Sequence, residues 1–256
     1  MSRVRVQEER GGAWLRVVLD ERPGNLLSLA MIRELAGTLT RAASAPGLKW
    51  ITLEGAGDHF SYGAKIQEHL PAPMAEVLPA MIQVVRDLLA FPAPTAALVR
   101  GRCLGGGFEL ALACDDILAD ADAEFGLPEV RLAAFPPMAA ALLPARVGAS
   151  RAARAMVAGD RQTAGYWHDA GLVSLAAPAA SLREAAAAWF DRHFAPRSAV
   201  ALAHAARAAR LVLRAQAEPA LAAAERQYLD ELLATRDAVE GIQSWIDKRP
   251  PRWENE

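Results

Sequence analysis

The chain changes character near residue 180, and this change limits the folds it can adopt more than any other feature. Before that point, short runs rich in Val, Leu and Ile alternate with longer runs whose apolar residues recur at helical spacing. Such alternation is typical of an α/β fold in which helices pack against a sheet. After that point the strand signal disappears, and alanine-rich helical segments continue to the end. We therefore predict an α/β region followed by an all-helical tail.

The periodicity of the residues places the individual elements of both regions. Strands are expected in four segments rich in Val, Leu, Ile or Ala, at 14–20, 48–55, 95–101 and 115–126, the last with a turn. Helices are expected between them, at 29–44, 77–91 and 106–115. The tail is expected to form four further helices, at 181–195, 198–216, 218–235 and 236–249.

Composition and charge narrow the classes of protein that this chain can represent. Its 256 residues are 53% hydrophobic and 23% charged, which predicts a globular chain with ample length for a core. The net charge of -2 and the lack of a basic stretch argue against a nucleic-acid partner. No signal peptide or membrane-spanning run is apparent, so we expect a soluble cytoplasmic protein. Cys103 and Cys114 form no metal-binding pattern, and Cys114 is expected to be a buried reduced thiol.

A run of glycines between the strand 95–101 and the helix that follows is the first candidate site. Backbone N–H groups at such a helix start lack intrahelical partners and attract anions. The segment 101–115, GRCLGGGFELALACD, has neither a dinucleotide fingerprint nor a P-loop, so it suits a smaller species such as an oxyanion on a carbonyl carbon. A second glycine-bearing loop lies at 57–70, and the two loops together could supply a pair of N–H donors. The alternative is that both loops are ordinary turns.

Four ordered motifs resemble the enoyl-CoA hydratase/isomerase (crotonase) superfamily. The segment 101–136, from GRCLGGGFEL to LPEVRLAAFP, looks like the superfamily's signature, and HFSYGAKIQEHL at 59–70 resembles its F-S-x-G-A-D-[IL] loop. The segment 159–178 resembles its A-x-x-x-G-L-V region, and EGIQSWIDKRPPRWENE at 240–256 resembles its E-G-x-x-A-F-x-E-K-R ending. The resemblance covers nearly the whole chain, in the superfamily's order and spacing.

This resemblance implies a fold, an assembly and a class of substrate. The expected fold is a crotonase-like spiral of ββα units at 1–190, followed by a helical oligomerisation region at 191–256 that builds homotrimers, often paired as hexamers. Members bind acyl-CoA thioesters and stabilise a thioester enolate, so an acyl-CoA is the expected partner, with no further cofactor and no metal. The resemblance places the two oxyanion N–H groups at Ala64 and Gly106.

Two glutamates, Glu109 and Glu129, align with the carboxylates of the superfamily's hydratases. Isomerases, dehalogenases, decarboxylases and hydrolases of this fold often lack one or both, so their presence favours hydration. Two carboxyl groups beside an apolar pocket raise each other's pKa through desolvation and like charge. One can then keep its proton near neutral pH while the other is ionised and accepts a proton from the attacking water. We predict this acid/base pair without assigning which member holds the proton.

Three positions depart from the superfamily's pattern. Lys65 replaces an aspartate and either meets a CoA phosphate or is solvated, and Tyr62 replaces a small residue and either reaches the acyl pocket or packs. Pro137 stands where typical hydratases have a glycine whose N–H orients the catalytic water, a hydrogen bond that proline cannot make. The water must then be held by another group, or the reaction geometry differs.

Within the superfamily, the segments FSYGA, EHLP, LPE and FPP look most like those of cyclohexa-1,5-diene-1-carbonyl-CoA hydratases of anaerobic benzoyl-CoA degradation. Addition at the far end of a diene would require the water to sit elsewhere, which is consistent with Pro137. Phe135 and Met138 would then shape an apolar pocket for a ring.

Other candidate groups have weaker signals. Lys248 either neutralises a CoA phosphate or belongs to a charged helix end. His69 and His168 lack a matched nucleophile or ligand set and are expected to be surface or packing residues. The alternative functions are a straight-chain enoyl-CoA hydratase, a double-bond isomerase, and a non-catalytic RNA-binding or scaffold member of the fold. The two glutamates argue against the last of these.

Overall fold

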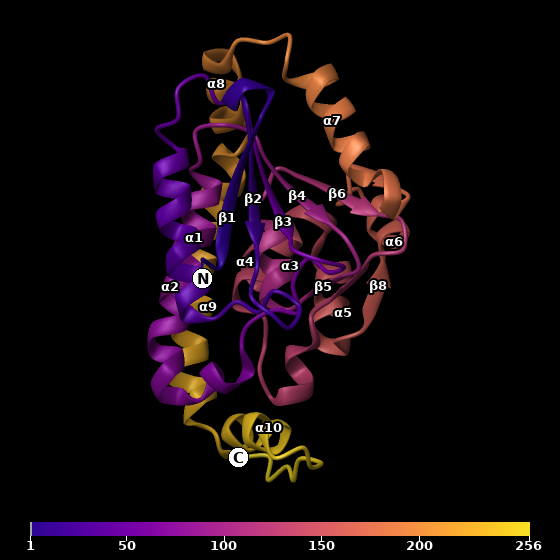
Figure 1. Cartoon of the computed structure of the whole chain (residues 1–256). Coiled ribbons are helices and arrows are strands. Elements are labelled where there is room, and N and C mark those ends of the chain that lie inside the picture. Colours follow the sequence, from indigo (N-terminus) through magenta and orange to yellow (C-terminus); the bar gives the residue numbers. More distant parts are fainter. Residues whose placement is uncertain (1) are drawn as a thin grey trace.

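The main sheet of the protein has six strands, in the order β1-β2-β3-β4-β6-β9. The computed structural model describes residues 2–256, and Figure 1 shows this sheet with helices on both sides. Neighbouring strands run parallel except for β1, which pairs antiparallel with β2 at the edge of the sheet and is mostly exposed. The six strands are β1 (Val4–Glu9), β2 (Trp14–Leu19), β3 (Trp50–Gly55), β4 (Thr95–Val99), β6 (Asp116–Asp120) and β9 (Leu175–Ala177).

A second sheet has three strands, β5 (Arg102–Leu104), β7 (Glu124–Gly126) and β8 (Arg161–Thr163). Consecutive strands divide between the two sheets: β4 joins the main sheet and β5 the small one, and β6 and β7 repeat this division. Helical structure follows each pair, as α3 (Gly106–Leu112) after β5 and the 3₁₀ helix η3 (Pro128–Leu132) after β7. The segment predicted as one short strand with a turn therefore contributes a strand to each sheet.

Helices cover both faces of the main sheet and enclose two apolar clusters. They are α1 (Leu29–Ala42), α2 (Pro71–Leu89), α4 (Pro137–Val147), α5 (Ala149–Ala158), α6 (Ala164–Asp169), α7 (Leu182–His193), α8 (Ala199–Ala209), α9 (Leu211–Arg226) and α10 (Arg236–Ile246). In Figure 1, α1, α2 and α9 lie on one side of the sheet, and α7 packs on the other against β6 and β9. The cluster under α7 is aromatic, because the Trp14 and Trp50 rings lie 5.0 Å apart and Phe190 stacks on Trp14 at 5.8 Å.

The predicted α/β front and helical tail are confirmed, whereas β1, α4 and α5 were not predicted and several predicted elements have other ends. α2 begins at Pro71, earlier than expected, because proline suits the first turn of a helix, where its missing N–H would have no partner. α9 continues through Pro219, although the sequence predicts a boundary between two helices there. The predicted helix 198–216 instead breaks at Arg210, between α8 and α9.

Arg210 fastens the helical tail to the α/β part of the chain. The residue is 3% exposed, and its guanidinium donates to the backbone oxygens of Phe91 and Ala93. It also pairs with Asp115, whose carboxylate accepts a further hydrogen bond of 2.8 Å from the Thr95 N–H. These partners lie directly before β4 and β6, which are neighbours in the main sheet. The helix break at Arg210 therefore coincides with a buried polar anchor for the tail.

Replacing Arg210 with alanine is expected to lower the free energy of unfolding by about 2–4 kcal/mol, because Asp115 and two carbonyl groups lose a buried partner. The matched control is Glu218→Ala, which removes the exposed ion pair between Arg86 and Glu218. That change should alter the free energy of unfolding by less than about 1 kcal/mol. Denaturant unfolding followed by circular dichroism measures both, and equal effects would contradict the anchoring role.

Candidate active site

Two loops meet at the carboxyl end of the main sheet. β3 and β4 are parallel neighbours, so their carboxyl ends lie at the same edge. The loop after β3 pairs with β5 through a bridge between Ser61 and Cys103, and the Leu104 N–H donates to the Ser61 oxygen at 2.9 Å. This pairing leads directly to Ala64 on one loop and to the start of α3, at Gly106, on the other.

The backbone N–H groups of Ala64 and Gly106 lie close together at this meeting point. A Cβ built on Gly106 would lie 3.5 Å from the Ala64 nitrogen. Gly63, with a φ of +94°, lets the loops approach, because a Cβ there would lie only 2.7 Å from the Leu104 oxygen. Within residues 2–256, neither N–H donates to another protein group. The structure thus brings together the two donors that the resemblance assigns to an oxyanion hole.

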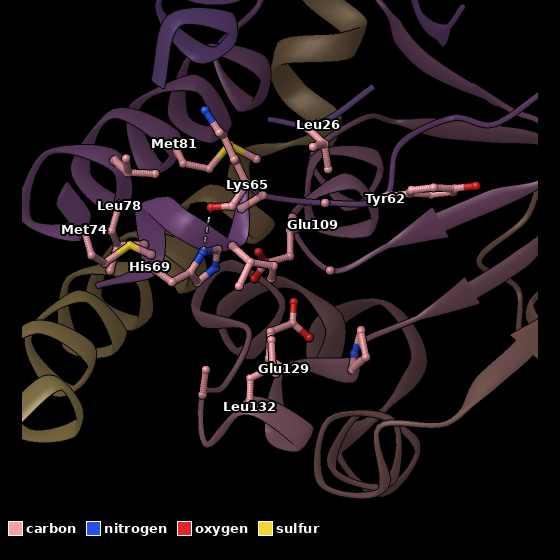
Figure 2. Close-up of a pocket in the computed structure, with 18 of the residues that line it drawn as sticks. Leu26, Tyr62, Lys65, His69, Met74, Leu78, Met81, Glu109, Glu129 and Leu132 are labelled. Carbon is pink, nitrogen blue, oxygen red and sulfur yellow. Dashed lines mark hydrogen bonds between the residues drawn. The ribbon is translucent and has the colours of Figure 1, made fainter. Parts of the chain in front are cut away.

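A cavity of about 730 Å³ opens beside these two donors. Part of its wall is apolar and comes from α2, where Met74, Leu78 and Met81 face the cavity in Figure 2. The predicted site residues that line it are Tyr62, Ala64, Lys65, Gly106, Glu109, Glu129, Phe135, Pro137 and Met138. Lys248 is not among the lining residues and is exposed beyond the end of α10.

Glu109 of α3 is held by the start of α4. The residue is 3% exposed, and its Oε1 atom accepts hydrogen bonds of 2.9 Å from the N–H groups of Met138 and Ala139. Burial raises the pKa of Glu109 to about 7, and the two hydrogen bonds limit this rise. Because these donors and the positive end of the α4 dipole favour a negative charge, the ionised form of Glu109 is well supported.

Glu129 faces Glu109 across the cavity with different neighbours. Figure 2 shows the two carboxyl groups pointing toward each other, one from η3 and one from α3. The Oε2 atom of Glu129 is buried and has no hydrogen-bond partner in the described part of the chain. Gly105, with a φ of +50°, leaves room for the Glu129 carboxyl group, because a Cβ at position 105 would lie 2.8 Å from Glu129 Oε1. Burial, and then the charge of Glu109, raise the pKa of Glu129 well above its usual value, so its neutral form is favoured.

Tyr62 and Lys65 line the cavity, but Figure 2 shows both side chains directed away from the carboxyl groups. The Tyr62 ring lies 4.9 Å from the His59 ring and 5.8 Å from the guanidinium carbon of Arg102. The Lys65 Nζ atom lies 3.6 Å from the Glu68 carboxylate, and its side chain is 42% exposed. In this arrangement Tyr62 packs against its neighbours, and Lys65 belongs to the exposed rim.

Tyr228 and His69 also line the cavity, although the sequence predicts neither as a site residue. Tyr228 follows α9, is 3% exposed, and packs with its ring 5.2 Å from the ring of Phe135. His69 Nδ1 lies 3.2 Å from the Lys65 oxygen, shown dashed in Figure 2, and burial lowers the pKa of its imidazole. A lone tyrosine in an alanine-rich tail and a lone histidine before a helix match no motif, so the sequence carries no signal for either.

The cysteines are free and buried, as predicted for Cys114, and burial raises the pKa of the Cys114 thiol to about 12. Among residues 2–256, no group of three or more His, Cys, Asp or Glu side chains is arranged to hold a metal ion. No helix in the same range combines the length and the apolar character needed to cross a bilayer.

Similar proteins match this chain over nearly its whole length. The family model for enoyl-CoA hydratase/isomerase matches residues 9–256. A cyclohexa-1,5-dienecarbonyl-CoA hydratase from Thauera aromatica is 39% identical, with 99% of this chain and 98% of that protein covered. A 2,3-dehydroadipyl-CoA hydratase from Escherichia coli (strain K12) is 35% identical, with 89% of each covered. The crystal structure of an enoyl-CoA hydratase from Mycobacterium avium subsp. paratuberculosis superposes with a TM-score of 0.87 at 29% identity over 98% of both chains, which confirms the predicted crotonase-like fold. The chain belongs to the enoyl-CoA hydratase/isomerase family.

Proposed function

We propose that this enoyl-CoA hydratase-type enzyme adds water to cyclohexa-1,5-diene-1-carbonyl-CoA, through an enolate stabilised by the Ala64 and Gly106 N–H groups. The observation that carries the proposal is the pair of facing glutamates in unlike environments beside an apolar cavity. Hydration needs a base for water and an acid for carbon, and one ionised and one neutral carboxyl group supply both. Relatives at 39% and 35% identity are named as hydratases, which supports this reaction type.

In this proposal Glu109 acts as the base and Glu129 as the acid. The Glu109 carboxylate takes one proton from water while the water oxygen bonds to a conjugated carbon, and the displaced electron pair moves to the thioester oxygen. Glu129 then gives its proton to carbon, and the thioester carbonyl forms again. One water has been added, with Glu109 protonated and Glu129 ionised, and proton exchange with solvent restores the pair.

The developing enolate charge would lie on the thioester oxygen, next to Ala64 and Gly106. No other protein group in residues 2–256 accepts from these two N–H groups, so they need no rearrangement when the charge develops. Each such donor typically lowers the barrier by about 3–4 kcal/mol. The backbone pair therefore supplies a large share of the transition-state stabilisation in this proposal.

A cyclic acyl group is supported by the size and the apolar lining of the cavity. Its volume of about 730 Å³ lies within the range typical of small-molecule sites, roughly 300–1,000 Å³. Phe135 and Met138 add apolar surface at the start of α4, where Pro137 has no N–H to offer a water. A relative that covers the whole chain is named as a cyclohexa-1,5-dienecarbonyl-CoA hydratase, which supports the same substrate here.

The trimeric or hexameric assembly stays part of the proposal. Val200 of α8 and Leu211 and Val212 of α9 are large apolar side chains exposed on the tail. Exposed apolar side chains on these two consecutive helices favour burial against another chain. This exposure supports the tail as the site of oligomerisation.

Glu109→Gln and Glu129→Gln are each expected to lower kcat by about 10²–10⁴-fold, because each removes one proton-transfer group. Glutamine keeps the size of the side chain, so the affinity for a saturated acyl-CoA should stay within a few fold. The wild-type rate should fall as the pH drops below about 7, because protonation of Glu109 removes the base. The control is Glu124→Gln, which neutralises an exposed carboxylate paired with Arg161. Steady-state kinetics measure all three, and full activity of either cavity variant would contradict the assignment.

The substrate is tested by incubating the pure protein with cyclohexa-1,5-diene-1-carbonyl-CoA and, separately, with crotonyl-CoA, in water enriched in ¹⁸O. Mass spectrometry should show the gain of one labelled water, mainly on the cyclic diene. Gain mainly on crotonyl-CoA would indicate a straight-chain hydratase, and a shifted double bond without label would indicate an isomerase. Failure to bind any acyl-CoA would overturn the proposal in favour of a non-catalytic role.

A further inference from the structure

The start of α4 has no N–H group left for a water molecule. Pro137 has none, and the Ala140 N–H donates to a backbone oxygen at 2.9 Å. The two N–H groups between them, of Met138 and Ala139, both donate to Glu109. In the proposed hydration, the water needs a donor toward its oxygen as well as the base that accepts its proton. Another polar group of the cavity must therefore supply that donor.

Tyr228 brings a hydroxyl group to the cavity from the helical tail. It lies in a single π-helical turn, η5 (Gln227–Glu231), that directly follows α9, and such turns are frequent at functional sites. The residue lines the cavity and is only 3% exposed. Its ring packs 5.2 Å from the ring of Phe135, which restricts its orientation. Tyr228 is thus a buried and supported group of the cavity wall.

The Tyr228 hydroxyl is available to a ligand in the cavity. No hydrogen bond from another group in residues 2–256 engages it. Burial and the charges of Glu129 and Glu109 raise the pKa of the phenol above its usual value, so it keeps its proton and can donate. Tyr228, Glu109 and Glu129 line the same cavity. The hydroxyl oxygen is not among the buried atoms that lack a partner in the described part of the chain, so a bound oxygen can reach it.

We infer that the Tyr228 O–H donates to the oxygen of the water that is added, and to the same oxygen once it is the hydroxyl of the product. This inference rests on the proposed hydratase function. Glu109 then accepts a proton from the water, and Tyr228 donates a hydrogen bond to the water oxygen. Tyr228 thereby replaces the backbone N–H donor that Pro137 lacks. The phenol exchanges no proton, so the balance of the reaction is unchanged and Tyr228 orients the reacting oxygen.

Two other polar residues of the cavity lining are less suited to this role. His69 Nδ1 faces the Lys65 oxygen, which only accepts, so this nitrogen carries the proton. Because burial lowers the pKa of His69, the other ring nitrogen stays an acceptor. The Tyr62 hydroxyl is directed away from the carboxyl groups in Figure 2. Of these three residues, Tyr228 offers a hydroxyl donor in the cavity wall whose ring is supported by Phe135.

Tyr228→Phe removes one oxygen atom and keeps the ring against Phe135. We expect kcat for hydration to fall by about 10–100-fold, with KM within about threefold of wild type, because the hydrogen bond acts on the water that is added. The matched control is Tyr166→Phe, which alters a tyrosine that packs against Trp167 at 5.0 Å outside the cavity and should keep wild-type kinetics. A kcat of the Tyr228 variant within twofold of wild type would overturn the inference.

Inhibition constants separate an orienting role from a structural one. The probes are the hydroxylated ring thioester that the wild type forms, and cyclohexanecarbonyl-CoA, which lacks the hydroxyl. Tyr228→Phe should weaken inhibition by the hydroxylated thioester about three- to tenfold and leave inhibition by cyclohexanecarbonyl-CoA unchanged. Equal weakening of both would show a structural role and overturn the inference. Failure of the proposed function itself would appear separately, as no gain of water with the wild type, and would overturn the inference with it.

Discussion

The N–H groups of Met138 and Ala139, at the start of α4, determine which of the two facing carboxyl groups is negatively charged. Two carboxylates in one apolar space cannot both be ionised without a large cost in free energy. Met138 and Ala139 donate to Glu109 alone, so the negative charge is stabilised there and Glu129 keeps its proton. The same two hydrogen bonds join α3 to α4, so the electrostatics of the pair depend on how these two helices pack.

The backbone and the helical tail complete the cavity around the two glutamates. Gly63 and Gly105 have positive φ and lie where a Cβ would strike the neighbouring loop or Glu129. The parallel pairing of β3 and β4 brings the two loops to one edge, where both oxyanion donors meet. Tyr228 reaches the cavity from the tail, which Arg210 fastens to the strands. The cavity wall is therefore complete only when the tail is docked.

Local motifs explain which residues the sequence could predict. The strand, glycine run and helix start that surround Gly106 stand together in the chain, so the site at the sheet edge could be predicted. The different environments of the two glutamates could not be predicted, because the donors to Glu109 lie 29 and 30 residues away in the sequence. They contact it only when α3 and α4 pack together. Tyr228 owes its place to the docking of the tail, which no motif encodes. β1 escaped prediction because its residues are mostly exposed and show no buried face.

The division of charge between Glu109 and Glu129 is the central claim, and isotope-edited infrared spectroscopy measures it directly. Above the Glu109 pKa of about 7, where Glu109 is ionised, the wild type should show a protonated carboxyl band from Glu129, whose pKa burial raises well above its usual value. Glu129→Gln should remove this band, and Glu109→Gln should retain it, because burial is the larger cause of the raised Glu129 pKa. About one unit below pH 7, a second band from Glu109 should appear. Absence of the first band, or its loss in Glu109→Gln instead, would contradict the account.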